Sequence, residues 1–464
     1  MKFLLINPPP DRGAIFSFSR HLPPMGLLYI GRILENFGHK VELLDFEAEL
    51  FSEEKIKNFL SSVDIVGISV TGYCVKNASL ISKIIKNFDP EISIVVGGPF
   101  CSIDPNLIFE ELEVDICVDG EGEKVIDKVI KSFEGEQNLS KIPGVFFREK
   151  DKIKKGPPAE LINDLDSIPF PARHLVDKYE YGYLGGIRML KSKLTSIMTA
   201  RGCPFNCRFC CVKSIAKKYR MRSTENVNKE IDEISEKYSS IYILDDNFLV
   251  DKKRAIKIMD HIIENDYDFE MWVTGVRIDS ANDELFKKMK KAGVKIINFG
   301  IESGNQDVLD YYNKKITLDQ IEKAVKQSRK AGFFTIGNFI LGAPIETKKH
   351  FENTVKLANK LPLELVFFSN LHYYKGSDLW KCANEEGKIS SKEYVIRGDK
   401  SRGLSNFTEE EVADYCIDSI KKFFFRPSYV IDQTIRAFVK KDPIFFKIAY
   451  QLATNKDIRK NMFN

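Results

Sequence analysis

The sequence contains no apolar run long enough to cross a membrane, no short-period repeat and no low-complexity tract. It also has little excess of either charge: 70 Lys and Arg residues face 66 Asp and Glu residues, for a formal net charge of +4. Because the two signs are interspersed, we expect no extended basic surface for nucleic acid. The apolar run at the start is too short for a secretory signal, so a cytoplasmic location is expected.

Cysteine is scarce, with nine residues in a chain of 464, and all but one group of them are scattered. An odd number of scattered cysteines does not fit a disulfide framework and favours a reducing compartment. The length predicts two or three domains, each able to bury its own core.

The one cysteine-rich stretch reads Thr-Ala-Arg-Gly-Cys-Pro-Phe-Asn-Cys-Arg-Phe-Cys and places Cys203, Cys207 and Cys210 at a Cys-x3-Cys-x2-Cys spacing. Three thiolates hold a metal centre but leave one coordination position open, whereas structural zinc closes its own tetrahedron. The spacing therefore favours catalysis. Two alternatives stay open: buried cysteines that act as small apolar residues, or a zinc site completed by a distant His. Cys211 breaks the spacing and is interpreted as a neighbouring wall residue.

This stretch resembles the cluster motif of the radical S-adenosylmethionine (SAM) superfamily, in which an aromatic residue such as Phe209 usually precedes the last cysteine. The resemblance implies a 4Fe-4S cluster held by the three cysteines, with SAM bound at the open iron and cleaved to a 5′-deoxyadenosyl radical. It also implies an electron donor such as flavodoxin or ferredoxin. The protein's part in such chemistry is to position the cofactors and exclude water.

The first 135 residues alternate short apolar runs with helical patterns, which predicts a doubly wound, Rossmann-like parallel sheet. Helices are expected at 26–37 and 77–88. The expected strands are 2–6, 40–45, 65–70, 93–96 and 116–118.

The turns after these strands are rich in small residues, and ligands of such sheets collect at the carboxyl ends of the strands. Ser69-Val70-Thr71-Gly72, Gly97-Gly98-Pro99 and Gly120-Glu121-Gly122-Glu123 are three such turns. Paired glycines let backbone approach a ligand, although they also serve simply as tight turns. No Gly-x-Gly-x-x-Gly follows the first strand, which disfavours a dinucleotide site.

Three motifs in order resemble a cobalamin-binding domain: Leu22-Pro23-Pro24-Met25-Gly26-Leu27, the Gly97 turn and Asp119-Gly120-Glu121-Gly122-Glu123. None of the six His lies in an Asp-x-His-x-x-Gly pattern, so no His ligand to cobalt is implied, and a cobalamin-free domain is the alternative. By resemblance, the corrinoid and its nucleotide tail would be lined by Ser69, Val70, Thr71, Gly97, Gly98, Gly120 and Gly122.

Residues 136–190 are dense in Gly and Pro and are expected to form an ordered linker. From 191 to 385 strand and helix signals alternate again, which predicts a partial (β/α)6 barrel of the TIM type, and 386–464 are helical in pattern. The expected barrel strands lie near 195–199, 241–244, 269–274, 295–301, 335–341 and 365–369.

Polar residues stand where the barrel strands end, which is where such barrels place their working side chains. SAM offers an ammonium and a ribose diol to carboxylates and a carboxylate to Arg. By resemblance, Asp245, Asp246 and Asn247 meet the amine and Arg277 the carboxylate. Glu302 and Ser303 then meet the ribose, and the loop of Gly342 supports adenine. Strand-end caps and salt bridges are the alternative, and Glu346 would then cap the next helix.

Two further regions are ambiguous. After the sixth barrel strand, Tyr373 or His372 would quench a radical or position substrate, or would simply be packed and hydrogen-bonded. At the C-terminus, basic and aromatic residues interleave over 421–427 and 438–447. This pattern fits either peripheral contact with a membrane or a helical cap over the open side of the barrel.

Together these resemblances imply a cobalamin-dependent radical SAM enzyme that methylates an unactivated carbon of a small-molecule or lipid-like substrate. A radical cyclisation or rearrangement without methyl transfer is the enzymatic alternative. A non-catalytic cobalamin or iron–sulfur sensor is the alternative from another class. A methylthiotransferase is disfavoured, because Cys74, Cys101 and Cys117 show no cluster spacing.

Overall fold

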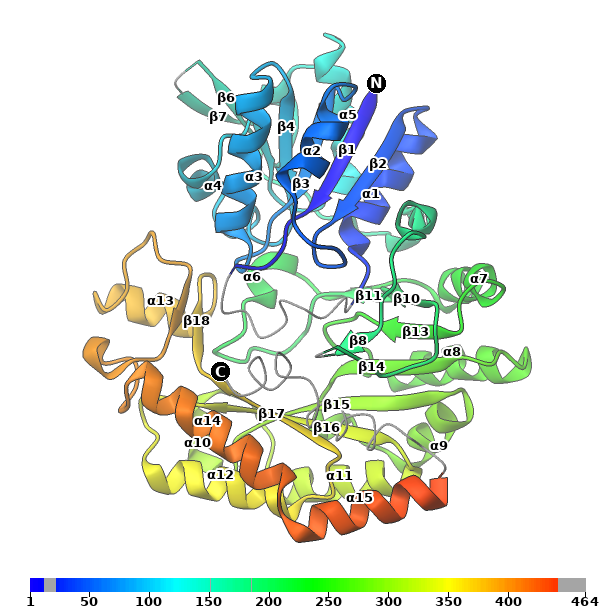
Figure 1. Cartoon of the computed structure of the whole chain (residues 1–464), viewed down its shortest axis with the longest axis vertical. Helices are drawn as coiled ribbons and strands as arrows, with labels where there is room; N and C mark the ends of the chain where they lie inside the picture. The colour runs from blue at the N-terminus through cyan, green and yellow to red at the C-terminus, as the bar shows by residue number, and fades with distance from the viewer. Residues whose placement is uncertain (12–21, 151, 185, 441–464) are drawn as a thin grey trace. The chain divides into compact units, whose positions relative to one another are not determined.

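The computed structural model describes residues 1–11, 22–150, 152–184 and 186–440 (Figure 1). The chain divides into two compact units. The first comprises Met1–Gly182 together with Ser214–Arg222, and the second comprises Tyr183–Lys213 together with the chain from Ser223 onward.

The first unit is built on a seven-stranded sheet in the order β2-β1-β3-β4-β5-β6-β7. Its first five strands pair in parallel, which confirms the predicted doubly wound sheet. Near-continuous runs of Val, Ile and Leu form these strands because both faces of the sheet are covered. They are β1 (Lys2–Asn7), β2 (Lys40–Asp45), β3 (Ile65–Ser69), β4 (Ser93–Gly97) and β5 (Ile116–Val118).

Five helices cover this sheet. The helices α1 and α5 pack together, whereas α3 packs against α2 and α4. Side-chain caps fix two of the starts: Ser52 accepts from the third residue of α2, and Asp104 accepts from the third residue of α4. The helices are α1 (Met25–Asn36), α2 (Glu53–Leu60), α3 (Val75–Phe88), α4 (Pro105–Glu111) and α5 (Ile126–Phe133).

The sheet also includes two strands that the sequence did not predict. The strands β6 (Val145–Glu149) and β7 (Lys152–Lys155) lie in the expected linker and extend the sheet in antiparallel fashion from β5. Within β6 only Val145 and Phe147 are buried, which is the alternation of a half-exposed strand. The surrounding Gly and Pro residues obscured this short pattern.

The second unit contains a six-stranded parallel sheet in the order β10-β13-β14-β15-β16-β17, so the predicted strands are confirmed. Over the residues that the structure describes, β10 and β17 are edge strands and the sheet does not close. The strands are β10 (Leu194–Ile197), β13 (Ser240–Ile243), β14 (Glu270–Val276), β15 (Val294–Glu302), β16 (Phe334–Leu341) and β17 (Leu365–Asn370). The helices between and after them are α7 (Thr224–Ser235), α8 (Lys252–Glu264), α9 (Asp283–Lys291), α10 (Gln306–Tyr311), α11 (Leu318–Ala331), α12 (Lys348–Lys360) and α13 (Asp378–Glu385).

Two C-terminal helices complete the described chain. The helix α14 (Glu409–Phe424) packs along the edge strand β17, and α15 (Pro427–Lys440) follows it. Phe423 and Tyr429 are buried in this packing, and the Tyr429 hydroxyl donates to the Glu364 carbonyl. Most of the predicted 438–447 segment lies outside the described residues. No helix in the described part of the chain is long and apolar enough to cross a membrane.

Candidate functional site

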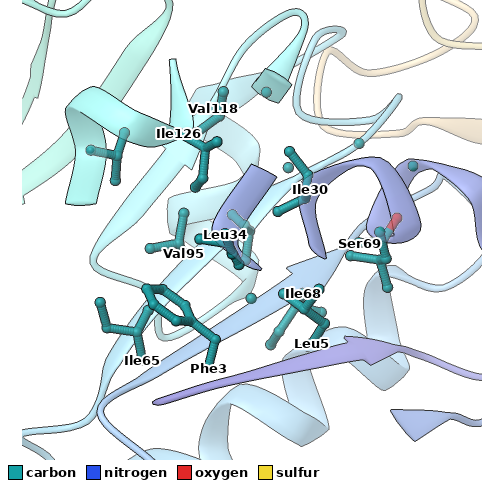
Figure 2. A pocket seen from close by; sticks show the side chains of 18 of the residues that line it. Phe3, Leu5, Ile30, Leu34, Ile65, Ile68, Ser69, Val95, Val118 and Ile126 are labelled. Carbon is teal, nitrogen blue, oxygen red and sulfur yellow. The ribbon is translucent and has the colours of Figure 1, made fainter. Parts of the chain in front are cut away.

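A cavity lies in the first unit between the sheet and the helices α1 and α5 (Figure 2). Its closed part holds about 160 Å³, and the space amounts to about 870 Å³ when the open solvent at its mouth is included. Most of its lining is aliphatic. Strand residues such as Leu5 and Ile68 form one wall, and Ile30 and Leu34 of α1 form the other.

Five of the seven residues predicted to bind cobalamin line this cavity: Ser69, Gly97, Gly98, Gly120 and Gly122. The other two stand outside the lining. The Val70 amide donates to the Gly97 carbonyl over 2.8 Å, and the Thr71 hydroxyl donates to the Cys74 sulfur over 3.4 Å. Val70 and Thr71 therefore shape the turn rather than the cavity wall.

Glycine occurs at two neighbouring positions of this wall, Gly97 and Gly98, for different physical reasons. Gly98 has a φ of +111°, and a Cβ there would stand 2.8 Å from the Val70 carbonyl oxygen, so the fold itself demands glycine. A Cβ on Gly97 would meet nothing within 4 Å. The open space beside Gly97 lies at the carboxyl end of a parallel sheet, which is where such sheets bind their ligands.

The cluster motif lies in the second unit, on the loop between β11 (Ala200–Arg201) and α6 (Val212–Ala216). Cys203, Cys207 and Cys210 are each partly exposed. Burial raises the pKa of Cys203, and it raises the pKa of Cys210 to about 12. The Cys210 amide donates to the Cys207 carbonyl over 3.0 Å, which draws the loop into a turn.

Three thiols on one short loop are the donor set that an iron–sulfur cluster requires, with one position left for another ligand. Among the described residues, no three His, Cys, Asp or Glu side chains converge on a single point. Because metal binding and the ordering of its ligands are coupled, cluster binding would draw the three thiolates together.

Arg277, just beyond β14, faces the cluster loop and is 5% exposed. Its guanidinium carbon lies 3.7 Å from the centre of the Phe205 ring, and its Nη1 lies 3.9 Å from the Cys207 sulfur. Nε and Nη2 donate to the two carboxylate oxygens of Asp279, each over 3.0 Å. The predicted carboxylate partner of SAM is thus already held rigidly beside a cluster cysteine.

Lys314 is a second buried cation at this site, and sequence reasoning missed it. Its Nζ donates to Glu302 Oε1 over 2.6 Å and lies 5.9 Å from the centre of the Phe209 ring. Burial alone would lower the pKa of Lys314, but the Glu302 carboxylate beside it raises the pKa overall. Lys315 is exposed, and no sequence signal separates the two lysines.

The three residues predicted to meet the SAM amine are placed differently from one another. Both carboxylate oxygens of Asp245 accept from Thr199, from its amide over 2.6 Å and its hydroxyl over 2.5 Å. Burial raises the pKa of Asp245 to about 6. Asn247 is buried, and its side-chain oxygen accepts from the Leu249 amide. Asp246 is exposed, and its carboxylate accepts from the Gly202 amide over 3.1 Å, next to Cys203.

Glu302 ends β15 with a φ of +66°, a conformation that costs a non-glycine residue energy and is typical of functional positions. Ser303 is fully buried, and its hydroxyl lies 3.3 Å from that of Thr354 and accepts from the Asn305 amide. These contacts make Ser303 part of the internal packing.

Gly342, predicted to support adenine, has a φ of +100°. Its amide and that of Ala343 donate to Glu346 Oε2 over 2.7 and 2.8 Å. Burial raises the pKa of Glu346 to about 7. Thr347, together with His350, forms the capping box at the start of α12. The helix is therefore capped by Thr347 and not by Glu346, the residue considered for this role from the sequence. Glu346 instead shapes the Gly342 loop.

The loop after β17 does not present Tyr373 as a free group. Tyr373 is 3% exposed, and its hydroxyl donates to the Leu404 carbonyl over 2.7 Å. His372 stacks on the Tyr374 ring, and burial together with Arg397 lowers the pKa of His372 to about 4. These contacts favour the alternative interpretation of Tyr373 as a packed, hydrogen-bonded residue.

Comparison with known proteins matches a different family profile to each of two parts of the chain. The profile of the Radical SAM superfamily matches residues 197–358, and that of the B12 binding domain matches residues 12–130. An uncharacterized methyltransferase of Pyrococcus horikoshii is 32% identical over 442 residues, which span 93% of this chain and 94% of the relative. The hopanoid C-3 methylase of Methylococcus capsulatus is 26% identical over 388 residues, spanning 81% and 71% of the two chains.

Two solved structures share the fold. The radical SAM methyltransferase TsrM of Kitasatospora setae, solved with cobalamin and a [4Fe-4S] cluster, aligns with a TM-score of 0.67 and 20% identity over 84% of this chain and 75% of its own. The cobalamin-dependent SAM radical enzyme OxsB, solved with aqua-cobalamin and SAM, aligns with a TM-score of 0.70 and 18% identity over 99% and 74%. The chain belongs to the radical SAM enzymes, and within them to the group that carries a B12-binding domain.

Proposed function

We propose that this protein is a cobalamin-dependent radical SAM methyltransferase that acts on an unactivated carbon of a small molecule. One observation carries the proposal: a three-cysteine loop and a glycine-lined cavity at the carboxyl end of a parallel sheet occur in one chain. The relatives named as methyltransferases, including the hopanoid C-3 methylase, support methyl transfer as the reaction.

Different residues of the chain would bind the iron–sulfur cluster and cobalamin. Cys203, Cys207 and Cys210 would hold a 4Fe-4S cluster, and cobalamin would enter the cavity beside Gly97. When bound, these groups and SAM supply a 5′-deoxyadenosyl radical and a transferable methyl group. The protein positions them and keeps water away from the radical.

Four side chains would orient SAM. Asp246 suits the ammonium of SAM, because Thr199 donates to the carboxylate of Asp245 and not to that of Asp246. Arg277 and Lys314 bring two positive charges to the cluster loop and suit the carboxylate. Glu302 suits the ribose diol, with Lys314 setting its position.

The loop that starts at Gly342 would support the adenine. Glu346 fixes this loop from inside by accepting both of its first amides. A Cβ on Gly342 would stand 3.0 Å from the Asn370 side-chain oxygen, so glycine keeps the loop close to the end of β17. Ser303, Asp245 and Asn247 would act indirectly, by holding the strand ends in place.

An electron donor such as flavodoxin or ferredoxin is part of the proposal, because SAM cleavage consumes one electron. A lipid-like substrate and membrane contact through the C-terminal helices stay predictions. The outward residues of α15 include Ile431, Ile435 and Phe438, which are 59%, 57% and 73% exposed.

A radical cyclisation without methyl transfer is the second candidate. The anaerobic magnesium-protoporphyrin IX monomethyl ester cyclase of Cereibacter sphaeroides is 26% identical over 420 residues, which span 87% of this chain and 67% of that enzyme. The two candidates differ in one step that needs no substrate. A methyltransferase must pass a methyl group from SAM to reduced cobalamin, releasing S-adenosylhomocysteine, whereas a cyclase need not.

The test is anaerobic reconstitution with iron, sulfide, hydroxocobalamin, a strong reductant and SAM labelled in its methyl group. We expect labelled methylcobalamin with an equal amount of S-adenosylhomocysteine, and 5′-deoxyadenosine above the level of a Cys207→Ala control. Deoxyadenosine without labelled methylcobalamin would leave the cyclase as the better candidate. Absence of both products would overturn the proposed turnover and favour a sensor that keeps the family's fold.

A further inference from the structure

The chain crosses between its two units immediately after the cluster motif. Lys213 belongs to the second unit, residues Ser214–Arg222 belong to the first, and Ser223 belongs to the second again. The crossing segment begins four residues after Cys210. The backbone that carries the last cluster cysteine is therefore tied covalently to a segment that packs within the cobalamin-binding unit.

One buried ion pair anchors this segment. Arg220 Nη1 donates to Glu121 Oε2 over 2.7 Å and to the Ile162 carbonyl over 2.5 Å. The same Glu121 oxygen accepts from the Ile162 amide over 2.7 Å. The side chains of Arg220 and Glu121 are 5% and 11% exposed. Buried charges of this kind depend on each other, because removing one leaves the other without compensation.

The acidic partner belongs to the turn that lines the cavity. Glu121 stands between Gly120 and Gly122, which both line the cavity. Gly120 has a φ of +87°, and its amide donates to the Ser102 hydroxyl, so this turn is rigidly shaped. A ligand seated against the two glycines would press on the backbone that carries Glu121.

A second contact repeats the pattern. Lys217 Nζ lies 4.0 Å from Asp119 Oδ2 at the start of the same turn. Lys217 itself has a φ of +55°, an uncommon conformation that its surroundings must hold in place. Two basic residues of the crossing segment thus meet two acidic residues of the cavity turn, in the same order along both stretches.

From this arrangement we propose that Arg220 is a positioning residue that couples cobalamin binding to the order of the cluster loop. Cobalamin against Gly120 and Gly122 fixes Glu121, which fixes Arg220 and the backbone that leads back to Cys210. The inference rests on the proposed function, because it requires that the first unit binds cobalamin. Such coupling is reciprocal: an assembled cluster tightens cobalamin binding by the factor by which cobalamin favours the cluster.

The test compares amide hydrogen exchange in the full chain with and without hydroxocobalamin, together with cobalamin titrations of the cluster-free and cluster-loaded protein. In the unaltered protein we expect cobalamin to slow exchange several-fold at residues 119–123 and also at 203–222. The dissociation constant for cobalamin is expected to fall about five-fold or more when the cluster is present, within the usual range of such couplings.

Arg220→Met removes the charge and keeps most of the volume. In this variant we expect cobalamin to protect 119–123 but no longer 203–222, and the cluster to leave the cobalamin affinity unchanged. Lys86→Met is the matched control, because Lys86 pairs with Asp115 elsewhere in the same unit. It should behave as the unaltered protein. If Arg220→Met does not fold, Arg220→Met with Glu121→Gln removes both charges and serves in its place.

The outcomes separate the two claims. If cobalamin protects 119–123 but not 203–222 in the unaltered protein, or if Arg220→Met keeps the coupling, the role of Arg220 is overturned while cobalamin binding stands. If the unaltered protein neither binds hydroxocobalamin nor shows protection at 119–123, the cobalamin part of the proposed function fails, and the inference fails with it.

Discussion

Lys314 Nζ lies 2.6 Å from Glu302 Oε1, and these two side chains are only 7% and 8% exposed. Glu302 holds this contact with a φ of +66°. A strained backbone and a buried ion pair are each costly, and they occur here at the end of a strand that faces the cluster loop. Under the proposed function, SAM would offer these two charges new partners, which would give a physical reason for keeping them.

Replacing Lys314 with Met is expected to weaken both the fold and SAM binding. Breaking a buried pair by removing one partner typically costs about 3 to 5 kcal/mol, because the other charge is left buried. Denaturant unfolding measures the first effect, and equilibrium dialysis with SAM on the cluster-loaded protein measures the second, where we expect at least a ten-fold loss of affinity.

The matched control for this change is Lys315→Met, which removes an exposed neighbour and should alter neither quantity. Adding Glu302→Gln to Lys314→Met should restore much of the stability but not the SAM affinity. Full affinity in Lys314→Met would show that the pair serves the fold alone.

We expect Glu346 to make the stability of the second unit depend on pH. Because burial raises its pKa from 4.5 to about 7, the folded protein binds this proton more tightly than the unfolded chain does. The contribution of Glu346 to the free energy of unfolding is complete below pH 4.5 and is lost as the pH rises to about 7. The loss amounts to about 3 kcal/mol.

Glu346→Gln keeps an oxygen for the Gly342 and Ala343 amides and removes the titration. The difference in unfolding free energy between the unaltered protein and this variant should therefore fall from pH 4.5 to 7 and stay constant above. Glu352→Gln, at an exposed position of α12, is the control with no such trend. A difference independent of pH would mean that Glu346 has the same pKa in the folded and unfolded states.

A larger residue at Gly97 tests ligand binding in the cavity without disturbing the fold. Since a Cβ there meets nothing within 4 Å, Gly97→Leu should fill the cavity and shift the melting temperature little. We expect hydroxocobalamin to bind at least ten-fold more weakly, as measured by spectral titration, and Gly97→Ala to show a smaller effect. Unchanged affinity in Gly97→Leu would place the ligand elsewhere.

The cysteine series tests the metal centre itself. Alanine at Cys203, Cys207 or Cys210 should each reduce the iron bound after anaerobic reconstitution well below the roughly four atoms per chain of an intact cluster. Cys211→Ala should retain that iron, because Cys211 lies outside the spacing. Iron analysis and visible absorption measure both results, and loss of iron in Cys211→Ala alone would contradict the assignment of ligands.

Much of the architecture was predictable because its signals are local. Continuous apolar runs bounded by Gly and Pro predicted eleven strands, and the structure confirms all of them. The hairpin of β6 and β7 escaped prediction, since two short strands with only Val145 and Phe147 buried give too weak a pattern. The ligand site was implied by small residues at three strand ends, Ser69, Gly97 and Gly120 among them, which a parallel sheet gathers at one edge.

The sequence by itself determined the predicted donor set of the metal centre, the parallel sheets and the strand ends that carry polar residues, because each follows from residues close together along the chain. Only the tertiary structure decided which of these side chains are already engaged in hydrogen bonds or ion pairs within the protein. In the folded chain Asp245 accepts from Thr199, and Tyr373 donates to the Leu404 carbonyl. Lys314 pairs with Glu302, and Arg220 pairs with Glu121. Burial and pairing set the charge and reach of a side chain, and both depend on residues distant in sequence.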